Sequence, residues 1–372
     1  MSLRDEFPVL SDCTYLNSNS TGALPRGISA VLAEYGAEML AWRDERWASW
    51  LPLLDRYHAS LERLLGASPG TVMSDASSSV LLSRVLSCFD FRERPRVVTT
   101  NREFPSAGFL LRALARYGAE VVVVDVAGED PEGALAAALD ERTCALVASH
   151  GGFQTGALLD LAVLQARCRA RGVVFVVDAY QTVGTVPIDV AALELDVVLG
   201  GAHKWLCGST ETAFVYVRPE LLTTLEPAFT GWVATDAPFG FTPRHAFAPT
   251  AWRFAGGTPQ VLPARISQIG LDLLLELGID AIRIHSLACT DRIVAHADEA
   301  RIEVLTPRAP ERRGGIVALR FEGDLEVCRR LVHQGFVCSH RGGLRIAPHA
   351  YNTLSEIDEF FEALHGVRRE LS

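Results

Sequence analysis

Short apolar runs recur through the first two thirds of the chain and predict β-strands. The runs are almost wholly apolar, without the alternation of a half-exposed strand, and this is typical of strands that are covered on both faces. The six predicted strands cover residues 96–100, 121–125, 145–149, 173–177, 196–199 and 212–217.

Segments with helical periodicity separate several of these strands. Residues 131–139 and 158–171 place apolar side chains at the 3.6-residue period of an α-helix. Alternating strands and helices favour an α/β fold with a mainly parallel sheet.

The pattern changes after about residue 220. Residues 227–260 are rich in proline, glycine and aromatic residues and predict few regular elements. We expect a large α/β domain over residues 21–255 and a smaller α+β domain over residues 256–372, with residues 1–20 packed on the smaller one. The elements predicted beyond residue 260 are helices at 263–277, 325–334 and 354–364 and a strand at 315–320.

Composition narrows the class of protein further. Hydrophobic residues make up 49% of the 372 positions and charged residues 22%, as in soluble globular proteins. A net charge of −10 argues against nucleic acid as the main partner. No apolar stretch reaches the roughly 18–20 residues needed to span a bilayer, and the acidic N-terminus does not resemble a signal peptide. We expect a cytoplasmic protein with no membrane partner.

The eight cysteines are scattered and form no CxxC pair. Metal and redox motifs are therefore not expected, and most of these side chains should be buried as small hydrophobic groups.

Polar residues follow three of the predicted strands, where ligands bind in parallel sheets. They are Ser149-His150, Asp178 and His203-Lys204. Asp178 and Lys204 lie 26 residues apart, and we expect one helix and one strand between them, which would make them neighbours at the sheet edge. Pyridoxal 5′-phosphate (PLP) needs a lysine for its aldehyde and an acid for its ring nitrogen. The pair therefore predicts a PLP site.

Other residues suit the remaining parts of this cofactor and its substrate. Small hydroxyl residues at 74–79 precede a predicted helix at 80–86, whose first N–H groups would bind phosphate. Phe104 could stack on the ring, and the Gln154 amide could reach its phenolic oxygen. Arg345 could bind a substrate carboxylate through two hydrogen bonds.

These residues fall into motifs of a known family. The chain resembles the class V aminotransferases, which are PLP enzymes, and within them it is most similar to kynureninases. The matching segments run nearly end to end: YLNSNSTG from Tyr15, FPS from Phe104, DAYQ from Asp178, HKWL from His203, GW from Gly231, GTP from Gly257 and RIAPHAYNT from Arg345.

The resemblance implies a PLP-dependent transferase fold of the aspartate aminotransferase type (fold type I), in a homodimer whose active sites lie at the subunit interface. It also implies a role for each candidate residue. Lys204 would form the Schiff base, Asp178 would pair with the pyridine nitrogen, and no metal is expected. The remaining implied contacts are Ala76, Ser77, His203 and Thr258 to phosphate, Phe104, Gln154 and Gln181 to the rest of the cofactor, and Asn19 and Arg345 to the substrate.

The implied activity is cleavage of an amino acid at its β-carbon through an external aldimine. The chain departs from the kynureninase pattern at Ala107, Gln181, His203 and residues 209–211, positions that we expect to surround the cofactor. We therefore do not expect kynurenine itself as substrate. Class V aminotransferases, cysteine desulfurases or C–S lyases, and epimerases remain alternatives, as does a non-catalytic binding protein. A desulfurase would need a mobile cysteine, for which Cys338 is the nearest but displaced candidate.

Overall fold

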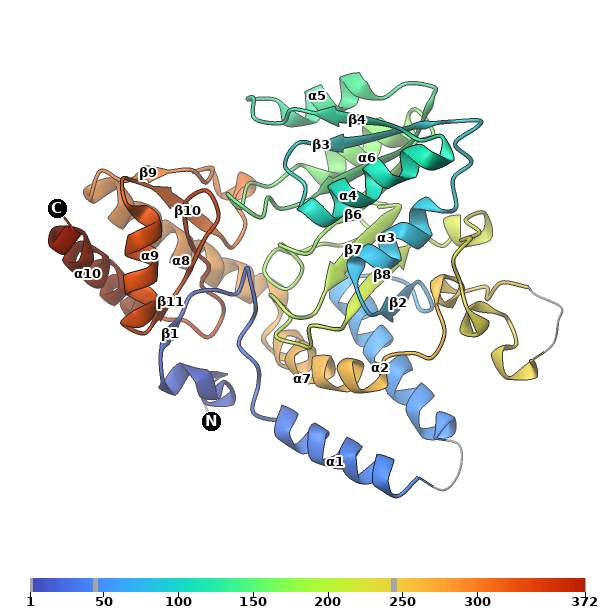
Figure 1. The fold of residues 1–372 in the computed structure, drawn as a ribbon, viewed down its shortest axis with the longest axis horizontal. Helices are drawn as coiled ribbons and strands as arrows, with labels where there is room; N and C mark the ends of the chain where they lie inside the picture. Colours follow the sequence, from blue (N-terminus) through green and yellow to red (C-terminus); the bar gives the residue numbers. More distant parts are fainter. Residues whose placement is uncertain (1–2, 43–45, 242–245, 372) are drawn as a thin grey trace.

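A seven-stranded sheet forms the centre of the larger part of the molecule (Figure 1). The computed structural model describes residues 3–42, 46–241 and 246–371. Only β8 runs antiparallel to its neighbours, so the predicted, mainly parallel sheet is confirmed. The strands in spatial order are β2 (Val72–Asp75), β8 (Ala213–Val217), β7 (Val197–Gly201), β6 (Val174–Asp178), β5 (Thr143–Ser149), β3 (Arg96–Thr100) and β4 (Glu120–Val124).

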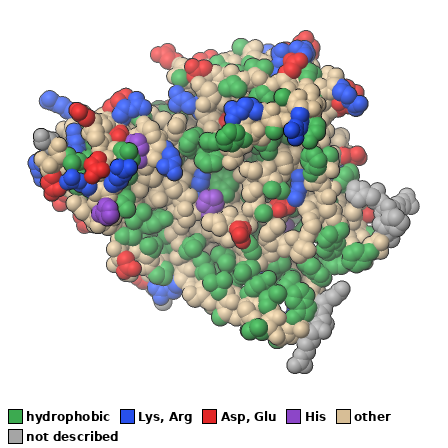
Figure 2. All heavy atoms as spheres, in the orientation of Figure 1, with side chains coloured by type: hydrophobic (Ala, Val, Ile, Leu, Met, Phe, Trp, Pro, Cys, Tyr) green, Lys and Arg blue, Asp and Glu red, His purple; other side chains and the backbone are tan. Residues whose placement is uncertain are grey.

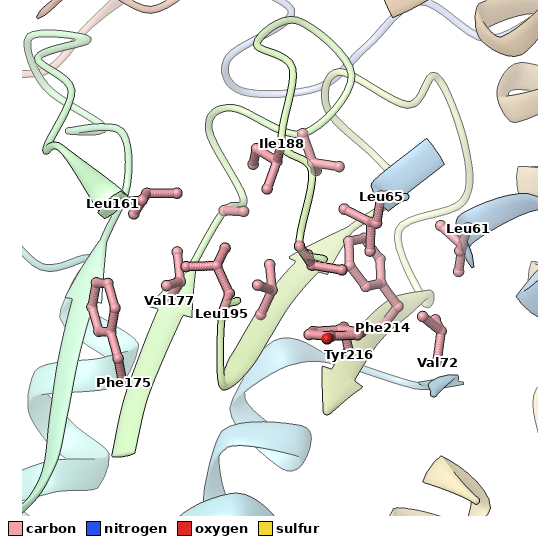
Figure 3. Close-up of a cluster of buried hydrophobic side chains, with 14 of the residues drawn as sticks. Leu61, Leu65, Val72, Leu161, Phe175, Val177, Ile188, Leu195, Phe214 and Tyr216 are labelled. Carbon is pink, nitrogen blue, oxygen red and sulfur yellow. The ribbon is translucent and has the colours of Figure 1, made fainter. Parts of the chain in front are cut away.

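The apolar runs form strands because both faces of the sheet are covered. Successive side chains of a strand point to opposite faces. In β6, Phe175 and Val177 belong to one buried cluster, whereas Val176 belongs to the cluster on the other face. Figure 3 shows the first cluster, in which Phe175 and Val177 lie with Leu161 and Leu195. Since each face has its own core, the strands need apolar residues at every position.

Helices cover the two faces of this sheet, and α1 lies along the lower edge of the molecule in Figure 1. The predicted helix at 158–171 begins only at Leu161, because Leu158 pairs with Gly151 and the Asp160 side chain caps the helix by accepting from Val163 N. The helices of this part are α1 (Ile28–Leu40), α2 (Trp47–Leu65), α3 (Ser78–Leu86), α4 (Pro105–Ala113), α5 (Pro131–Ala138), α6 (Leu161–Arg169) and α7 (Val261–Leu277).

The prediction of a helix between Asp178 and Lys204 is wrong. Residues 179–196, all described, contain turns and no α-helix. Gly184 has a φ of +93°, which does not continue a helix, and Pro187 lacks the N–H that a helix interior needs. The connection between β6 and β7 is therefore an irregular loop. The two strands still pair in parallel, so the expected proximity of their ends does not depend on the helix.

The smaller part contains an antiparallel sheet and three helices that share one core. The N-terminal segment joins it, because β1 (Thr14–Tyr15) pairs in parallel with β11 (Phe336–Val337). The predicted division at residues 255 and 256 stays a prediction, and α7, just beyond it, packs against α2 in the core of the large sheet. The other elements are β9 (Glu303–Val304), β10 (Val317–Arg320), β12 (Ser339–His340), β13 (Leu344–Ile346), α8 (Ile279–Glu299), α9 (Asp324–His333) and α10 (Leu354–Leu371).

Short 3₁₀-helices account for the remaining helical turns. Within the described residues of 227–260 these are the only helical elements, as the proline and glycine content predicts. Across the described part of the chain, no helix is long and apolar enough to cross a membrane. The 3₁₀-helices are η1 (Leu3–Glu6), η2 (Pro8–Ser11), η3 (Leu114–Tyr117), η4 (Leu221–Thr223), η5 (Trp232–Ala234), η6 (Pro238–Gly240), η7 (Ala251–Phe254) and η8 (Pro310–Arg312).

Candidate active site

The carboxyl ends of the central strands border a cavity of about 310 Å³. Ser149 ends β5 and Asp178 ends β6, and the two are register partners. Lys204 follows the end of β7 by three residues, and it lines the same cavity as Ser149 and Asp178. The predicted site residues that line this cavity are Asn19, Phe104, Asp178, Gln181, His203, Lys204 and Arg345.

The Lys204 amine lies between two aromatic rings. Its Nζ is 4.7 Å from the ring centre of Tyr180 and 5.6 Å from that of Phe104. Burial lowers the pKa of Lys204 to about 8, an effect that Asp178 opposes and Arg345 reinforces. A lysine with this pKa has far more neutral amine at pH 7 than a surface lysine, and only the neutral amine attacks an aldehyde.

Lys204 is the only lysine among the 372 residues, and the other 34 basic residues of the Lys and Arg total are arginines. The position of Lys204 after a predicted strand first marked it as the PLP lysine. Its uniqueness is a stronger signal, and the sequence carries it without any structural information. A Schiff base on a side-chain amine can form at no other position of this chain.

The lowered pKa predicts how PLP uptake by the apoprotein depends on pH. Burial disfavours the charged amine, so the reactive neutral form should rise through pH 8 and not through about 10.5, the value expected for an unburied lysine. We expect the rate of appearance of visible absorption to increase about fivefold to tenfold between pH 7 and pH 9. Stopped-flow mixing of apoprotein with PLP measures this rate. A rate that keeps rising tenfold per pH unit up to pH 10 would contradict the prediction.

Asp178 is a half-buried carboxyl group in the lining of the cavity. Its Oδ1 accepts a hydrogen bond from the backbone N–H of Tyr180 at 2.9 Å. Burial raises the pKa of Asp178, while this hydrogen bond and the Lys204 charge counteract the rise. A cation placed against the carboxyl group, such as a protonated ring nitrogen, would stabilise the charged form. Asp178 therefore suits its predicted role, which stays a prediction.

A second carboxyl group, Glu103, lies against Ser149 and was missed by the sequence reasoning. It accepts hydrogen bonds from the backbone N–H and the hydroxyl of Ser149, at 3.0 and 2.6 Å, and from the hydroxyl of Thr100 at 2.6 Å. Burial raises the pKa of Glu103. Glu103 does not line the cavity, and its contacts fix Ser149, which does.

The predicted phosphate contacts divide into two groups. Ser78 and Ser79, the first residues of α3, line the cavity, whereas Ala76 and Ser77 lie just outside its lining. The Ser77 hydroxyl accepts from Val80 N at 3.3 Å and so caps the helix. A phosphate at this helix start would meet the free N–H groups and the positive end of the helix dipole.

His203 lines the cavity and Thr258 does not. His203 Nδ1 lies 3.0 Å from the Tyr180 hydroxyl, and burial together with Lys204 lowers the pKa of His203 to about 4. The imidazole is therefore neutral at pH 7, with one ring nitrogen as a donor and the other as an acceptor. The implied contact of Thr258 to phosphate stays a prediction.

Gln181 and Gln154 were both predicted to contact the cofactor. The Gln181 amide is bonded to other parts of the protein, and Gln154 lies at a different cavity. Gln181 Nε2 donates to the backbone oxygen of Asn19 at 3.0 Å, and its Oε1 accepts from Trp205 Nε1 at 3.2 Å. Both ends of the Gln181 amide thus hold neighbouring segments in place. Gln154 lines a different cavity, of about 400 Å³, beside Arg308 and Arg312.

Asn19 and Arg345 present polar groups that lack protein partners. Asn19 is buried, and neither its Nδ2 nor its Oδ1 has a hydrogen-bond partner in the protein. Arg345 donates to Phe153 O at 2.6 Å and to the Ser20 and Ser339 hydroxyls at 3.2 and 3.0 Å. No carboxylate lies within ion-pair distance of Arg345 in the described residues. The Arg345 Nε and both polar atoms of the Asn19 amide are buried without a protein partner, which fits an anionic ligand, since unsatisfied buried polar groups are costly.

Tyr180, Phe153 and Arg341 are among the lining residues that were not assigned roles from the sequence. Tyr180 lies inside the quoted DAYQ segment, so its position beside Asp178 was a usable signal. Phe153 and Arg341 come from loops, where no strand or helix period indicates the direction of a side chain. The departure at residues 209–211 does not surround the cavity as expected: none of the three lines it, and Ser209 N donates to Ser267 of α7 at 3.0 Å.

The cysteines behave as predicted, since six of the eight are buried and all are free thiols. Cys338 does not line the cavity. Its Sγ lies 3.8 Å from that of Cys328, and this contact and burial raise the pKa of the Cys338 thiol. Cys338 is therefore a buried thiol that is not activated as a thiolate.

A lysine, a carboxyl group and a helix start around one cavity define the site of a PLP enzyme on a fold-type-I scaffold. Residues 71–360 match the family Aminotransferase class-V, which is PLP-dependent. This chain belongs to the class V aminotransferase family, and PLP is its cofactor.

Similarity to individual proteins covers nearly the whole chain. The chain is 30% identical to the kynureninase of Deinococcus radiodurans, over 91% of this chain and 85% of that protein. It is 28% identical to the uncharacterized aminotransferase YcbU of Bacillus subtilis, over 95% and 94%. The cystine C–S lyase C-DES, in complex with cysteine persulfide, superposes with a TM-score of 0.89 at 22% identity, over 96% of this chain and 98% of C-DES. The structural match confirms the fold.

Proposed function

We propose that this protein is a kynureninase-like hydrolase or lyase, which cleaves an amino acid at its β-carbon and does not use kynurenine itself. The arrangement of Lys204, Asp178 and Arg345 around one cavity carries the proposal, because it supplies an amine, a ring partner and a carboxylate ligand. The 30% identity with a kynureninase over 91% of the chain supports β-carbon cleavage as the outcome.

Each residue has a definable task in such a reaction. Bound PLP supplies an electron sink that acidifies the bonds at the substrate Cα. Arg345 binds the α-carboxylate, which fixes the orientation of the Cα–H bond. The Lys204 amine, with its lowered pKa, accepts the Cα proton and can return one. Asp178 stabilises positive charge on the ring nitrogen, and the aromatic rings of Phe104 and Tyr180 lie beside the amine.

The bond that breaks joins Cβ to the next side-chain atom. In hydrolytic cleavage, the electron pair of this bond stays on Cβ, which takes a proton and becomes the methyl group of alanine. The departing acyl group takes the hydroxyl of a water molecule and leaves as a carboxylic acid. The atoms of this reaction balance with water as the only other reactant.

Departures from the kynureninase motifs support a different side chain on the substrate. Ala107 and His203 both line the cavity, in place of the aspartate and tyrosine of the resembled motifs. Ala107 removes an acid from the wall, and the neutral His203 contributes a hydrogen bond to Tyr180. A pocket with these changes offers other polar groups to a substrate side chain.

The test is a screen of L-amino acids, including kynurenine, against the PLP-loaded protein. We expect alanine to be released without a keto-acid acceptor. Amine transfer to an added keto acid would favour the aminotransferase alternative, and conversion of L- into D-amino acid would favour an epimerase. Pyruvate release would favour a C–S lyase. A protein that binds no PLP and releases no product would support the non-catalytic alternative.

Substitution of Cys338 separates the proposal from cysteine desulfuration. Because Cys338 is buried against Cys328 outside the cavity, we expect Cys338→Ala to change turnover of the best substrate by less than about twofold. Cys328→Ala is the matched control for loss of packing. If Cys338→Ala alone abolished turnover while its fold and PLP content stayed normal, a persulfide mechanism would replace β-carbon cleavage.

We further propose that the protein acts as a homodimer with shared active sites in the cytoplasm. Helix α1 buries none of its residues, and Leu32, Met39 and Leu40 are exposed along it. Figure 2 shows hydrophobic side chains gathered over this lower part of the molecule. Exposed apolar area of this kind is typical of interaction surfaces. Sedimentation velocity of the holoprotein should give twice the mass of 40.4 kDa, and a monomer at micromolar concentration would contradict it.

A further inference from the structure

Positive charge exceeds negative charge on the walls of the active-site cavity. Its lining contains Lys204, Arg341 and Arg345, and Asp178 is the only acidic residue among the described lining residues. Glu103 does not line the cavity, and burial raises its pKa, which favours the neutral form. The α-carboxylate of an amino acid accounts for Arg345 alone, so one guanidinium is left over.

The hairpin between β12 and β13 places the two arginines at one side of the cavity. Arg345 lies on β13 opposite Ser339 of β12, and Arg341 lies in the turn that joins the strands. Gly342 follows with a φ of +74°, a value that permits this tight turn. Repulsion from Arg341 adds to burial in lowering the pKa of Arg345 to about 10, so the two charges act on each other.

Arg341 has donors to offer to a ligand. One guanidinium nitrogen donates to the backbone oxygen of His340 at 2.9 Å. No ion pair of Arg341 occurs among the described residues, although the neighbouring His340 pairs with Asp324 at 2.9 Å. Since a guanidinium carries five N–H donors in a fork that matches a carboxylate, Arg341 retains a free face for a second anion.

We infer that Arg341 recognises a second acidic group, so that the substrate is an amino acid whose side chain carries a carboxylate or a related oxyanion. This rests on the proposed function, because it assumes that an amino acid occupies the cavity with its α-carboxylate at Arg345. The inference narrows the proposed function to acidic substrates. The departures at Ala107 and His203 leave the substrate side chain open.

The cofactor phosphate is the competing ligand for Arg341. It carries about −1.5 to −2 charges at pH 7 and would also attract a guanidinium. The start of α3 offers phosphate the N–H groups and hydroxyls of Ser78 and Ser79, and it needs no arginine for this. The experiment must therefore measure PLP affinity and amino-acid affinity separately.

The test titrates the holoprotein with matched pairs of amino acids, aspartate against asparagine and glutamate against glutamine. Binding is followed through the change in cofactor absorption, so it does not depend on product release. We expect the acidic member of at least one pair to bind at least about tenfold more tightly. In Arg341→Met this preference should fall to less than about twofold, with PLP affinity unchanged, and Arg341→Lys should recover part of it.

Arg329→Met removes the same charge from an exposed position in the same part of the molecule and should leave the preference intact. The inference is overturned if neither acid is preferred, if the preference survives Arg341→Met, or if Arg341→Met weakens PLP binding instead. Absence of alanine release from every amino acid in the activity screen would refute β-carbon cleavage and leave the recognition of acids standing.

Discussion

Lys204→Ala should abolish the visible absorption of the lysine-bound cofactor and lower turnover by at least about 10³-fold. The variant loses both the amine that holds PLP covalently and the base that moves the Cα proton. No other lysine can replace it, because the chain has only one. Absorption spectra of the dialysed proteins and turnover with the best substrate measure the two losses.

The single lysine also makes the position of the bond directly testable. Reduction of the wild-type holoprotein with borohydride should leave one cofactor per chain, on the peptide that contains Lys204, as read by mass spectrometry. Lys204→Arg keeps the positive charge without a reactive amine and should behave like Lys204→Ala. Added methylamine should restore part of the activity of Lys204→Ala if the fold is intact. Normal absorption and turnover in either variant would disprove the assignment.

Asp178→Asn should lower turnover by about 100-fold or more while PLP still binds covalently to Lys204. Asparagine keeps the size of the side chain and an oxygen that can accept from Tyr180 N, but it cannot balance a positive charge on the ring nitrogen. The ring then withdraws electrons less strongly from the substrate Cα. Single-turnover rates and the absorption maximum of the bound cofactor measure this effect.

Asp125→Asn is the matched control, because Asp125 directly follows β4 and is absent from the cavity lining. Its carboxylate accepts from Asn101 Nδ2 and from Ala127 N, so the variant tests the general cost of losing a carboxylate beside a strand end. We expect turnover of Asp125→Asn within about twofold of the wild type. Equal losses in both variants would mean that Asp178 acts only through stability.

The sequence predicted the six strands from 96 to 217 well, because strands that are buried on both faces leave continuous apolar runs. It gave no prediction for β2 or for α1, α2 and α8. The Val72–Asp75 strand is short and ends in polar residues, and its partner β8 is distant in the chain. Helix α1 has no buried face in the described structure, so its apolar residues follow no core-facing pattern.

Within the site, too, some residues were predicted from the sequence, whereas the contacts of others depend on tertiary packing. Asp178 and Lys204 were found from the sequence because the ends of adjacent parallel strands meet at one edge, even though the expected helix between them is a loop. The contacts of Gln154 and Gln181 to the cofactor stay predictions, and the packing around these two amides was not foreseen from the sequence. Gln181 holds Asn19 and Trp205, and Gln154 faces a neighbouring cavity.

The sequence by itself determined the sheet, the order of its polar strand ends and, through its single lysine, the position of the reactive amine. These features depend on local periodicity and on residue identity, which need no knowledge of distant contacts. Only the tertiary structure decided that Asn19 has unpartnered polar atoms, that Cys338 is buried, and that Arg341 joins Arg345 at the cavity. The direction of a loop side chain depends on segments far apart in the chain, and no local pattern encodes it.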